Sequence, residues 1–158
     1  MITIDFYQKK LELEEISLTQ QRAKLFHGIA MGLAWGVVFP ISIFIVRFFK
    51  HTNHYVKVHR FLQIAGGISV GTFGAAVISV SMADNPHTLV GLTLYFLVFL
   101  QLAIGITSIW SQAYLVSVNI GYFRLFKRSH KYLGASLLII AWFNIYLGMD
   151  TYGLLYGE

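Results

Sequence analysis

Four of the six histidines in this 158-residue sequence stand at the start of long apolar stretches. His27 and His59 precede such a stretch, and His87 and His130 open one. A neutral imidazole is a common ligand of transition metals. A single histidine at such a position is usually an interfacial residue bonded to headgroups or backbone, but four in equivalent positions indicate a shared role in holding a metal cofactor.

The stretches that follow these histidines are apolar enough to cross a membrane. The chain is 56% hydrophobic and 12% charged, with a mean hydropathy of +0.64, whereas soluble domains carry about 25% charged residues. Four charge-free windows approach or exceed the roughly 20 residues that cross a bilayer as a helix. They are Gly28 to Val46, Phe61 to Ala83, Thr88 to Trp110 and Tyr132 to Met149. The sequence therefore predicts an all-α integral membrane protein with a four-helix transmembrane bundle over residues 27–158.

The segments outside the windows differ in composition. Residues 1–26 mix acidic and basic residues with leucine and isoleucine at rough helical spacing, so we expect an amphipathic N-terminal helix on the membrane or on a partner. This segment lacks the pattern of a cleaved signal peptide, and we expect it in the mature chain. Between the second and third windows, Asp84 or Asn85 is placed to cap a helix that begins at Pro86.

Two further features affect the predicted spans. Pro40 lies inside the first window and is expected to kink that helix without ending it. Residues 111–123 contain no charge but are more polar than the third window that precedes them. We expect them at the interface, as a helix extension or a re-entrant loop.

Basic residues are concentrated in the first and third connections between spans. These are Arg47, Lys50, Lys57 and Arg60 in the first, and Arg124, Lys127, Arg128 and Lys131 in the third. The positive-inside rule then predicts that both connections face the cytoplasm or an organelle matrix, with both termini on the opposite side. The connections account for the net charge of +5, so no nucleic-acid interface is expected. His51 and His54 lie in the first connection and are interpreted as solvated.

Antiparallel spans place the four remaining histidines in two pairs. The N-terminal ends of the first and third spans lie at one membrane face, so His27 is expected to face His87. By the same reasoning His59 faces His130 at the other face. Zinc fits poorly, because it usually takes three or four protein ligands. A bis-histidine haem needs only two facing imidazoles, and the lack of cysteine favours b-type over c-type haem. The sequence thus predicts two haem b.

Glycines follow two of the histidines at a fixed distance. The segments "HTLVG" and "HKYLG" place Gly91 and Gly134 four residues after His87 and His130, on the same helix face. The missing side chain would let a porphyrin lie close to the backbone, so these two glycines are assigned to the cofactor. Most other glycines in the apolar windows are interpreted as helix-packing positions.

In their order along the chain, these motifs resemble the cytochrome b561 family, in particular the haem core of eukaryotic members that include DOMON-fused proteins. The resemblance covers most of the chain from His27 to Asp150. The matching motifs are "HGIAMGLAWGVVFPISIFIVRFF", "VHRFLQIAGG", "HTLVGL", Gln101, Arg124 six residues before His130, and "NIYLGMD". It implies a four-helix core with two b-type haems, one per membrane face. Such a core passes electrons across the bilayer, typically from ascorbate to monodehydroascorbate or ferric iron.

The resemblance also implies roles for basic residues near the predicted haems. Arg60, Arg124 and Lys131 are expected to pair with the anionic haem propionates on the basic side. Lys57 resembles a position that the family uses near its cytoplasmic ascorbate site, and we expect it to contact the donor. Electrons would then enter at the haem of His59 and its partner and leave at the other haem.

Three functions are compatible with the sequence. The first is a free-standing di-haem transmembrane oxidoreductase. The second is a haem-containing accessory subunit of a larger membrane complex, respiratory or otherwise, without reductase activity of its own. It is suggested by the absence of the extra helices or the DOMON module that family members carry. The third is a structural bundle without haem, which the histidine at the start of every span disfavours.

Overall fold

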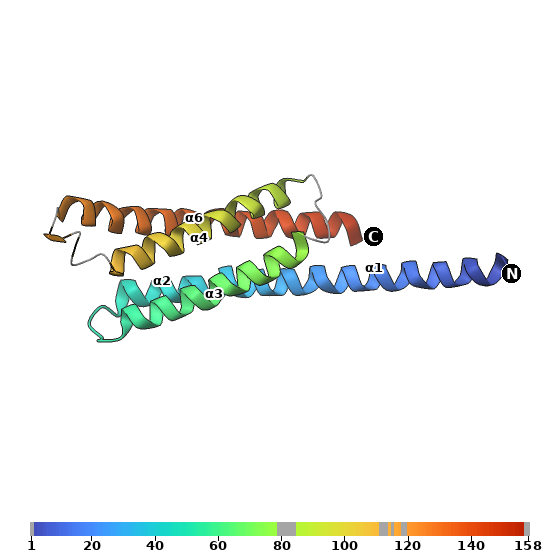
Figure 1. The fold of residues 1–158 in the computed structure, drawn as a ribbon, viewed down its shortest axis with the longest axis horizontal. Coiled ribbons are helices and arrows are strands. Elements are labelled where there is room, and N and C mark those ends of the chain that lie inside the picture. The colour runs from blue at the N-terminus through green and yellow to red at the C-terminus, as the bar shows by residue number, and fades with distance from the viewer. Residues whose placement is uncertain (1, 79–84, 111–113, 115, 118–119, 157–158) are drawn as a thin grey trace.

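The computed structural model describes residues 2–78, 85–110, 114, 116–117 and 120–156. Its elements, in order, are α1 (Ile2–Leu33), η1 (Ala34–Val38), α2 (Phe39–Phe48), α3 (Tyr55–Ile78), α4 (Pro86–Trp110) and α6 (Ile120–Tyr156). Figure 1 shows that α1, η1 and α2 follow one another as one long helix. The predicted all-α class is therefore confirmed for the described residues.

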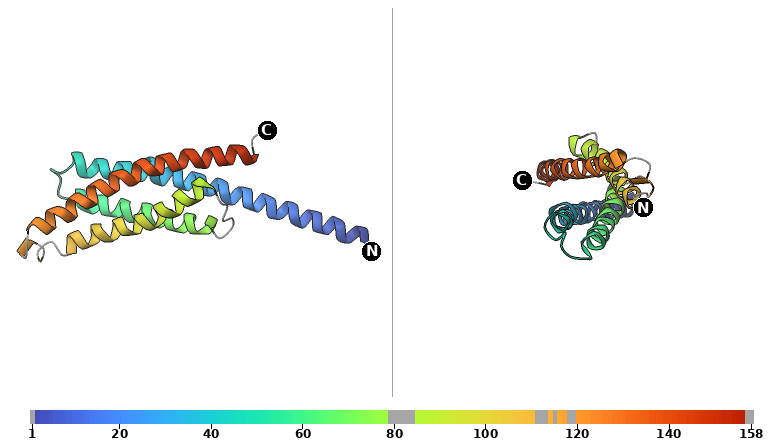
Figure 2. Two further views of the ribbon diagram at one scale, coloured as in Figure 1. Left: turned by 90° about the horizontal axis from the view of Figure 1, so that it is seen from above. Right: turned by 90° about the vertical axis from the view of Figure 1, so that its left-hand side faces the viewer.

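The helices form a bundle of two antiparallel pairs. α3 packs along α1 and α2, and α6 packs along α4; contacts of α3 with α4, and of α1 and η1 with α6, join the two pairs (Figures 1 and 2). Both chain termini lie toward one end of the bundle, and the end of α2 and the starts of α3 and α6 lie toward the other. The predicted separate N-terminal helix is the first part of α1, which continues beyond the bundle as an arm.

The surface of the bundle is apolar, as expected for a protein in lipid. Large hydrophobic side chains point outward along every helix, and Phe61, Leu89 and Ile139 are each at least 66% exposed. Within the described residues, three helical stretches are long and apolar enough to cross a membrane, namely Leu18–Phe48, Pro86–Ile109 and Ile120–Thr151. α3 is not among these three, and residues 79–83 of the predicted second span lie outside the described residues. The second span stays a prediction.

A π-helical turn interrupts the first long helix at the predicted kink. The Phe39 N–H donates to the carbonyl of Ala34, five residues earlier instead of four. Pro40 follows directly and has no N–H to donate. A turn of this kind accommodates one extra residue in the helix. The Trp142 indole N–H on α6 donates to the Trp35 carbonyl at 3.0 Å, which satisfies a carbonyl that the altered ladder leaves open.

The start of α4 follows the predicted capping pattern. Asn85 Oδ1 accepts a hydrogen bond from the Thr88 N–H at 2.9 Å, and Pro86 is the first helical residue. Asn85 is therefore the cap, and Asp84 lies outside the described residues. Residues 120–123 form the first turn of α6, whereas most of 111–119 is not described.

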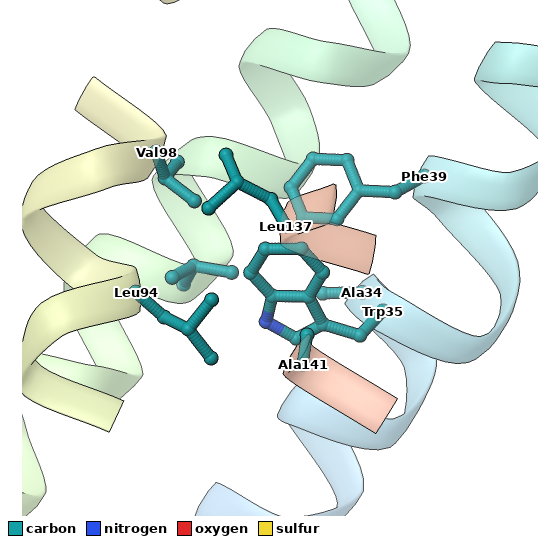
Figure 3. Close-up of a cluster of buried hydrophobic side chains, with 8 residues drawn as sticks. Ala34, Trp35, Phe39, Leu94, Val98, Leu137 and Ala141 are labelled. Atoms are coloured by element: carbon teal, nitrogen blue, oxygen red, sulfur yellow. The ribbon is translucent and has the colours of Figure 1, made fainter. Parts of the chain in front are cut away.

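A small buried core fills the middle of the bundle. Trp35 packs edge-on against Phe39 with ring centroids 4.7 Å apart, and both are 5% exposed. Gly66 on α3 lies against the Phe39 ring so closely that an added Cβ would be 2.6 Å from Phe39 Cε1. The core residues, most of them labelled in Figure 3, are Ala34, Trp35, Phe39, Val70, Leu94, Val98, Leu137 and Ala141. Because all the main helices contribute, this core fixes the register of one pair against the other.

Candidate functional site

The four histidines at the helix starts lie in two pairs. The ring centroids of His27 and His87 are 6.1 Å apart with an interplanar angle of 85°. Those of His59 and His130 are 6.4 Å apart at 87°. All four side chains are partly buried. The structure thus brings together the residues that the sequence paired, α1 with α4 and α3 with α6.

Hydrogen bonds at Nδ1 orient three of the four imidazoles. His87 Nδ1 lies 2.9 Å from the Asn144 carbonyl, and His27 Nδ1 lies 3.4 Å from the Phe73 carbonyl. His59 Nδ1 lies 3.0 Å from the Ser42 carbonyl. A carbonyl only accepts, so Nδ1 carries the proton in each case and Nε2 keeps its lone pair. This is the tautomer of a neutral imidazole that binds a metal through Nε2.

His130 differs from the other three. Within the described residues, its Nδ1 is buried without a hydrogen bond of ordinary geometry. The Gln101 side chain binds the backbone of His130, since its Nε2 donates a hydrogen bond to the His130 carbonyl at 2.7 Å. Gln101 therefore binds the backbone of His130, whereas the His130 imidazole lacks, among the described residues, the Nδ1 contact that its three counterparts have.

The carbonyls that face the imidazoles occupy equivalent positions in neighbouring helices. Asn144 lies fourteen residues after His130, and Phe73 lies fourteen residues after His59. Fourteen helical residues rise about 21 Å. α3 and α6 therefore each present their own histidine at one end and a carbonyl for another helix's histidine at the other. The two histidine pairs therefore form two layers about 21 Å apart along the helices. This separation fits inside a hydrocarbon core of about 30 Å.

α4 and α6 share a longer pattern that the sequence reasoning recognised only in part. In both helices a histidine is followed by glycine after four residues, by a carboxamide after fourteen and by a second glycine after eighteen. The positions are His87, Gly91, Gln101 and Gly105 in α4, and His130, Gly134, Asn144 and Gly148 in α6. Because the helices are antiparallel, each first glycine meets the other helix's carboxamide. Each second glycine meets the other helix's histidine.

The distances to these glycines define their roles. A Cβ on Gly134 would lie 2.7 Å from Gln101 Nε2, and one on Gly91 would lie 3.2 Å from Asn144 Nδ2. The structure therefore places these two predicted cofactor glycines against carboxamides, and their contact with a cofactor stays a prediction. Gly105 and Gly148, which the sequence reasoning did not single out, lie against the imidazoles of the two histidine pairs.

The predicted basic residues gather at the His59–His130 end, as Figure 1 shows for the starts of α3 and α6. Lys57, Arg124 and Lys131 are exposed. Arg60 is partly buried and lines a cavity of about 220 Å³ together with Ile64, Ile106 and Ile109. Two of its lining residues, Arg60 and Ile106, directly follow His59 on α3 and Gly105 on α4 in the sequence. The cavity is mainly apolar with one cation, and neither His59 nor His130 is among its lining residues.

The histidine pairs fit an iron porphyrin better than a bare metal ion. When two imidazole nitrogens bind one metal from opposite sides, each bond is about 2.0 Å and each ring centre lies roughly 1.1 Å beyond its nitrogen, so the ring centroids are about 6.2 Å apart. The observed distances are 6.1 and 6.4 Å. No group of three or more His, Asp or Glu side chains that could hold a metal ion occurs among the described residues.

Fold and site together define an all-helical bundle of membrane type with one histidine pair near each end. No protein-family model matches the chain, and no solved structure matches it. The chain is similar to a cytochrome b561 and DOMON domain-containing protein of Arabidopsis thaliana, with 27% identity over 136 residues. The similar region covers 80% of this chain and 28% of that relative. The chain thus spans little more than a quarter of the relative's length.

Proposed function

We propose that the chain is a transmembrane electron-transfer protein that holds two b-type haems. His27 and His87 would hold one haem, and His59 and His130 would hold the other. The observation that carries this proposal is the spacing of both pairs at 6.1 and 6.4 Å. The similarity to a protein with a cytochrome b561 region supports it independently.

The residues of this chain prepare each site for a haem. When bound, haem b supplies a one-electron Fe(III)/Fe(II) couple. The carbonyls of Ser42, Phe73 and Asn144 hold the imidazole protons on Nδ1 and thereby present Nε2 to the iron. The buried core around Trp35 separates the two layers and excludes water from the space between them. The proposed roles of Arg60, Arg124 and Lys131 are to pair with the propionates at the basic end.

The basic end is also where a small anionic donor would bind. Lys57 is exposed there, two residues before His59. We assign the donor to ascorbate or a similar one-electron reductant, because cations concentrate an anion at that surface. In this proposal His59 and His130 would hold the group that receives the electron, and His27 and His87 the group that passes it to monodehydroascorbate or ferric iron. In this proposal α3 is the fourth membrane-crossing helix, and the basic connections face the cytoplasm or an organelle matrix.

A second function is favoured by the N-terminal arm. Leu11, Leu18 and Leu25 are seven residues apart on α1, whose first part leaves the bundle, and they are 54%, 49% and 53% exposed. A row of exposed leucines offers an apolar contact surface for another protein, although Leu18 and Leu25 also belong to the stretch that is apolar enough to cross a membrane. The chain would then be a haem-containing accessory subunit of a larger membrane complex, without reductase activity of its own.

One spectroscopic experiment separates these functions. The protein is purified in detergent, and its reduced-minus-oxidised spectrum and haem-to-protein ratio are measured before and after ascorbate is added. Two haems per chain and reduction by ascorbate support the first function, whereas two haems without reduction by ascorbate support the second. Replacement of His87 or His130 by alanine is expected to remove one haem. The matched controls His51→Ala and His54→Ala, at exposed positions, are expected to keep both. Colourless protein would refute both proposals.

A further inference from the structure

Only one of the four imidazoles has a hydroxyl group beside its Nδ1 among the described residues. Ser42 on α2 is fully buried at 0% exposure. Its Oγ lies 2.7 Å from His59 Nδ1, while its carbonyl lies 3.0 Å from the same nitrogen. The His59 N–H is therefore directed at two acceptors that belong to one residue.

The hydrogen bonds around Ser42 fix its hydroxyl as an acceptor for His59. The Ser42 hydroxyl donates to the His59 carbonyl at 3.2 Å. Gln63, one turn further along α3, donates its Nε2–H to Ser42 Oγ at 3.0 Å. Because the only proton on Oγ is already used, the contact with Nδ1 is one in which His59 donates.

The other three histidines lack this arrangement. His87 has one carbonyl at 2.9 Å, and His27 has one at 3.4 Å, near the limit of a hydrogen bond. His130 Nδ1 has no hydrogen bond of ordinary geometry among the described residues. Hydrogen bonding at Nδ1 is therefore unequal within each pair, and it is strongest at His59.

We propose that Ser42 is a positioning residue that lowers the reduction potential of the haem bound by His59 and His130. This inference rests on the proposed function. A hydrogen bond donated from Nδ1 makes the imidazole a more electron-rich ligand. An electron-rich axial ligand stabilises ferric iron more than ferrous iron, so the potential falls. A lower potential at the end where electrons enter favours their passage to the haem of the other pair.

The test is a redox titration of the purified holoprotein, followed at the haem absorption bands. Ser42→Ala removes the hydroxyl but keeps the carbonyl of residue 42. We expect one of the two haem transitions to move to higher potential. The expected change in its reduction equilibrium constant is about three- to tenfold, and tenfold corresponds to about 59 mV for one electron. The second transition should not move.

Ser69→Ala is the matched control. Ser69 lies on α3, is partly buried and donates to the Ala65 carbonyl of its own helix at 2.9 Å, so both transitions should stay in place. Ser42→Cys retains a weak acceptor and should shift the same transition less, which supplies a second test if the alanine variant does not fold. Ser42→Ala in a His27→Ala, His87→Ala background should shift the one haem transition that remains. That shift would assign the affected transition to the His59–His130 pair.

Several results would overturn the inference. Two unmoved transitions in Ser42→Ala would show that the hydroxyl does not affect the iron. Equal shifts of both transitions would indicate a general loosening of the bundle, which is the outcome of a merely structural role. Failure of the proposed function is distinct, because unaltered protein would then show no haem absorption at all.

Discussion

Gly148 on α6 provides a direct test of how the His87 imidazole is seated. A Cβ at this position would lie 2.8 Å from His87 Cε1 and 3.0 Å from Nδ1, whereas ordinary contacts begin at 3.4 Å. Gly148→Ala therefore requires the ring to retreat by about 0.6 Å, the difference between 3.4 and 2.8 Å. The ring is bound to the same helix by its hydrogen bond to the carbonyl of Asn144, one turn before Gly148, at 2.9 Å, so it can retreat only if that bond lengthens.

The magnitudes predict loss of cofactor without loss of fold. Alanine improves helix propensity over glycine by about 1 kcal/mol, and a forced fit of one methyl group costs about 1–3 kcal/mol. The apoprotein should therefore be destabilised by at most about 2 kcal/mol, the difference of these two terms. The 0.6 Å retreat of the His87 ring is large relative to a metal–nitrogen bond of about 2.0 Å, so the ring would no longer reach a metal at bonding distance. We expect the haem-to-protein ratio of Gly148→Ala to fall from about two toward one.

Two other glycines control this experiment. A Cβ on Gly105 would lie 2.9 Å from His130 Cε1, so Gly105→Ala should remove the haem of the opposite pair. Gly153 is on the same helix as Gly148 but has nothing within 4 Å of its Cβ position. Gly153→Ala should keep both haems. If Gly148→Ala bound two haems with unaltered spectra, the described contact between glycine and imidazole would be refuted.

Three further substitutions test other parts of the structure. Trp142→Phe removes the indole N–H donated to the Trp35 carbonyl and should lower the free energy of unfolding in detergent by about 1–2 kcal/mol; an unchanged value would show that the altered helix ladder does not need this donor. Asn85→Ala removes the cap of α4 and should cost about 0.5–2 kcal/mol in the same assay, whereas Asn85→Asp should restore most of it. Lys57→Gln should slow reduction by ascorbate roughly two- to fivefold at low salt and have little effect at high salt. Lys9→Gln, on the distant arm, should leave that stopped-flow rate unchanged, and equal slowing in both variants would argue against a donor site at Lys57.

The pairing of the histidines could be predicted because it depends only on chain direction. The apolar windows predict the number of helices, and successive membrane-crossing helices run in opposite directions. The N-terminal ends of alternate helices therefore lie at the same membrane face. The same reasoning identified Asn85 and Pro86, whose capping role is local to a few residues. The continuity of α1 from Ile2 to Leu33 could not be predicted, because the apolar pattern that begins at Gly28 gives no sign that the expected N-terminal helix runs directly into the first span.

The residues that hold the imidazoles could not be found by local reasoning. Ser42 and Gly148 contact histidines that are distant in sequence, and the contact exists only once the helices have adopted their register. A signal for Gly105 and Gly148 was nevertheless present, since both helices repeat the spacing of histidine, glycine, carboxamide and glycine. Ser42 has no such counterpart. It lies fifteen residues after His27 instead of fourteen, and the π-helical turn between them conceals the relation.

That turn makes the first helix sensitive to its length. Each residue of an α-helix advances the azimuth by about 100°, so the additional residue within 34–38 sets the rotational phase of everything that follows it. Deleting one residue there would restore the regular α-helical hydrogen bonds. It would also rotate position 42 about the helix axis by roughly a quarter of a turn, away from α3. The irregular segment therefore acts as a spacer, and what looks like a defect in the first helix is what brings its second half into step with its neighbour.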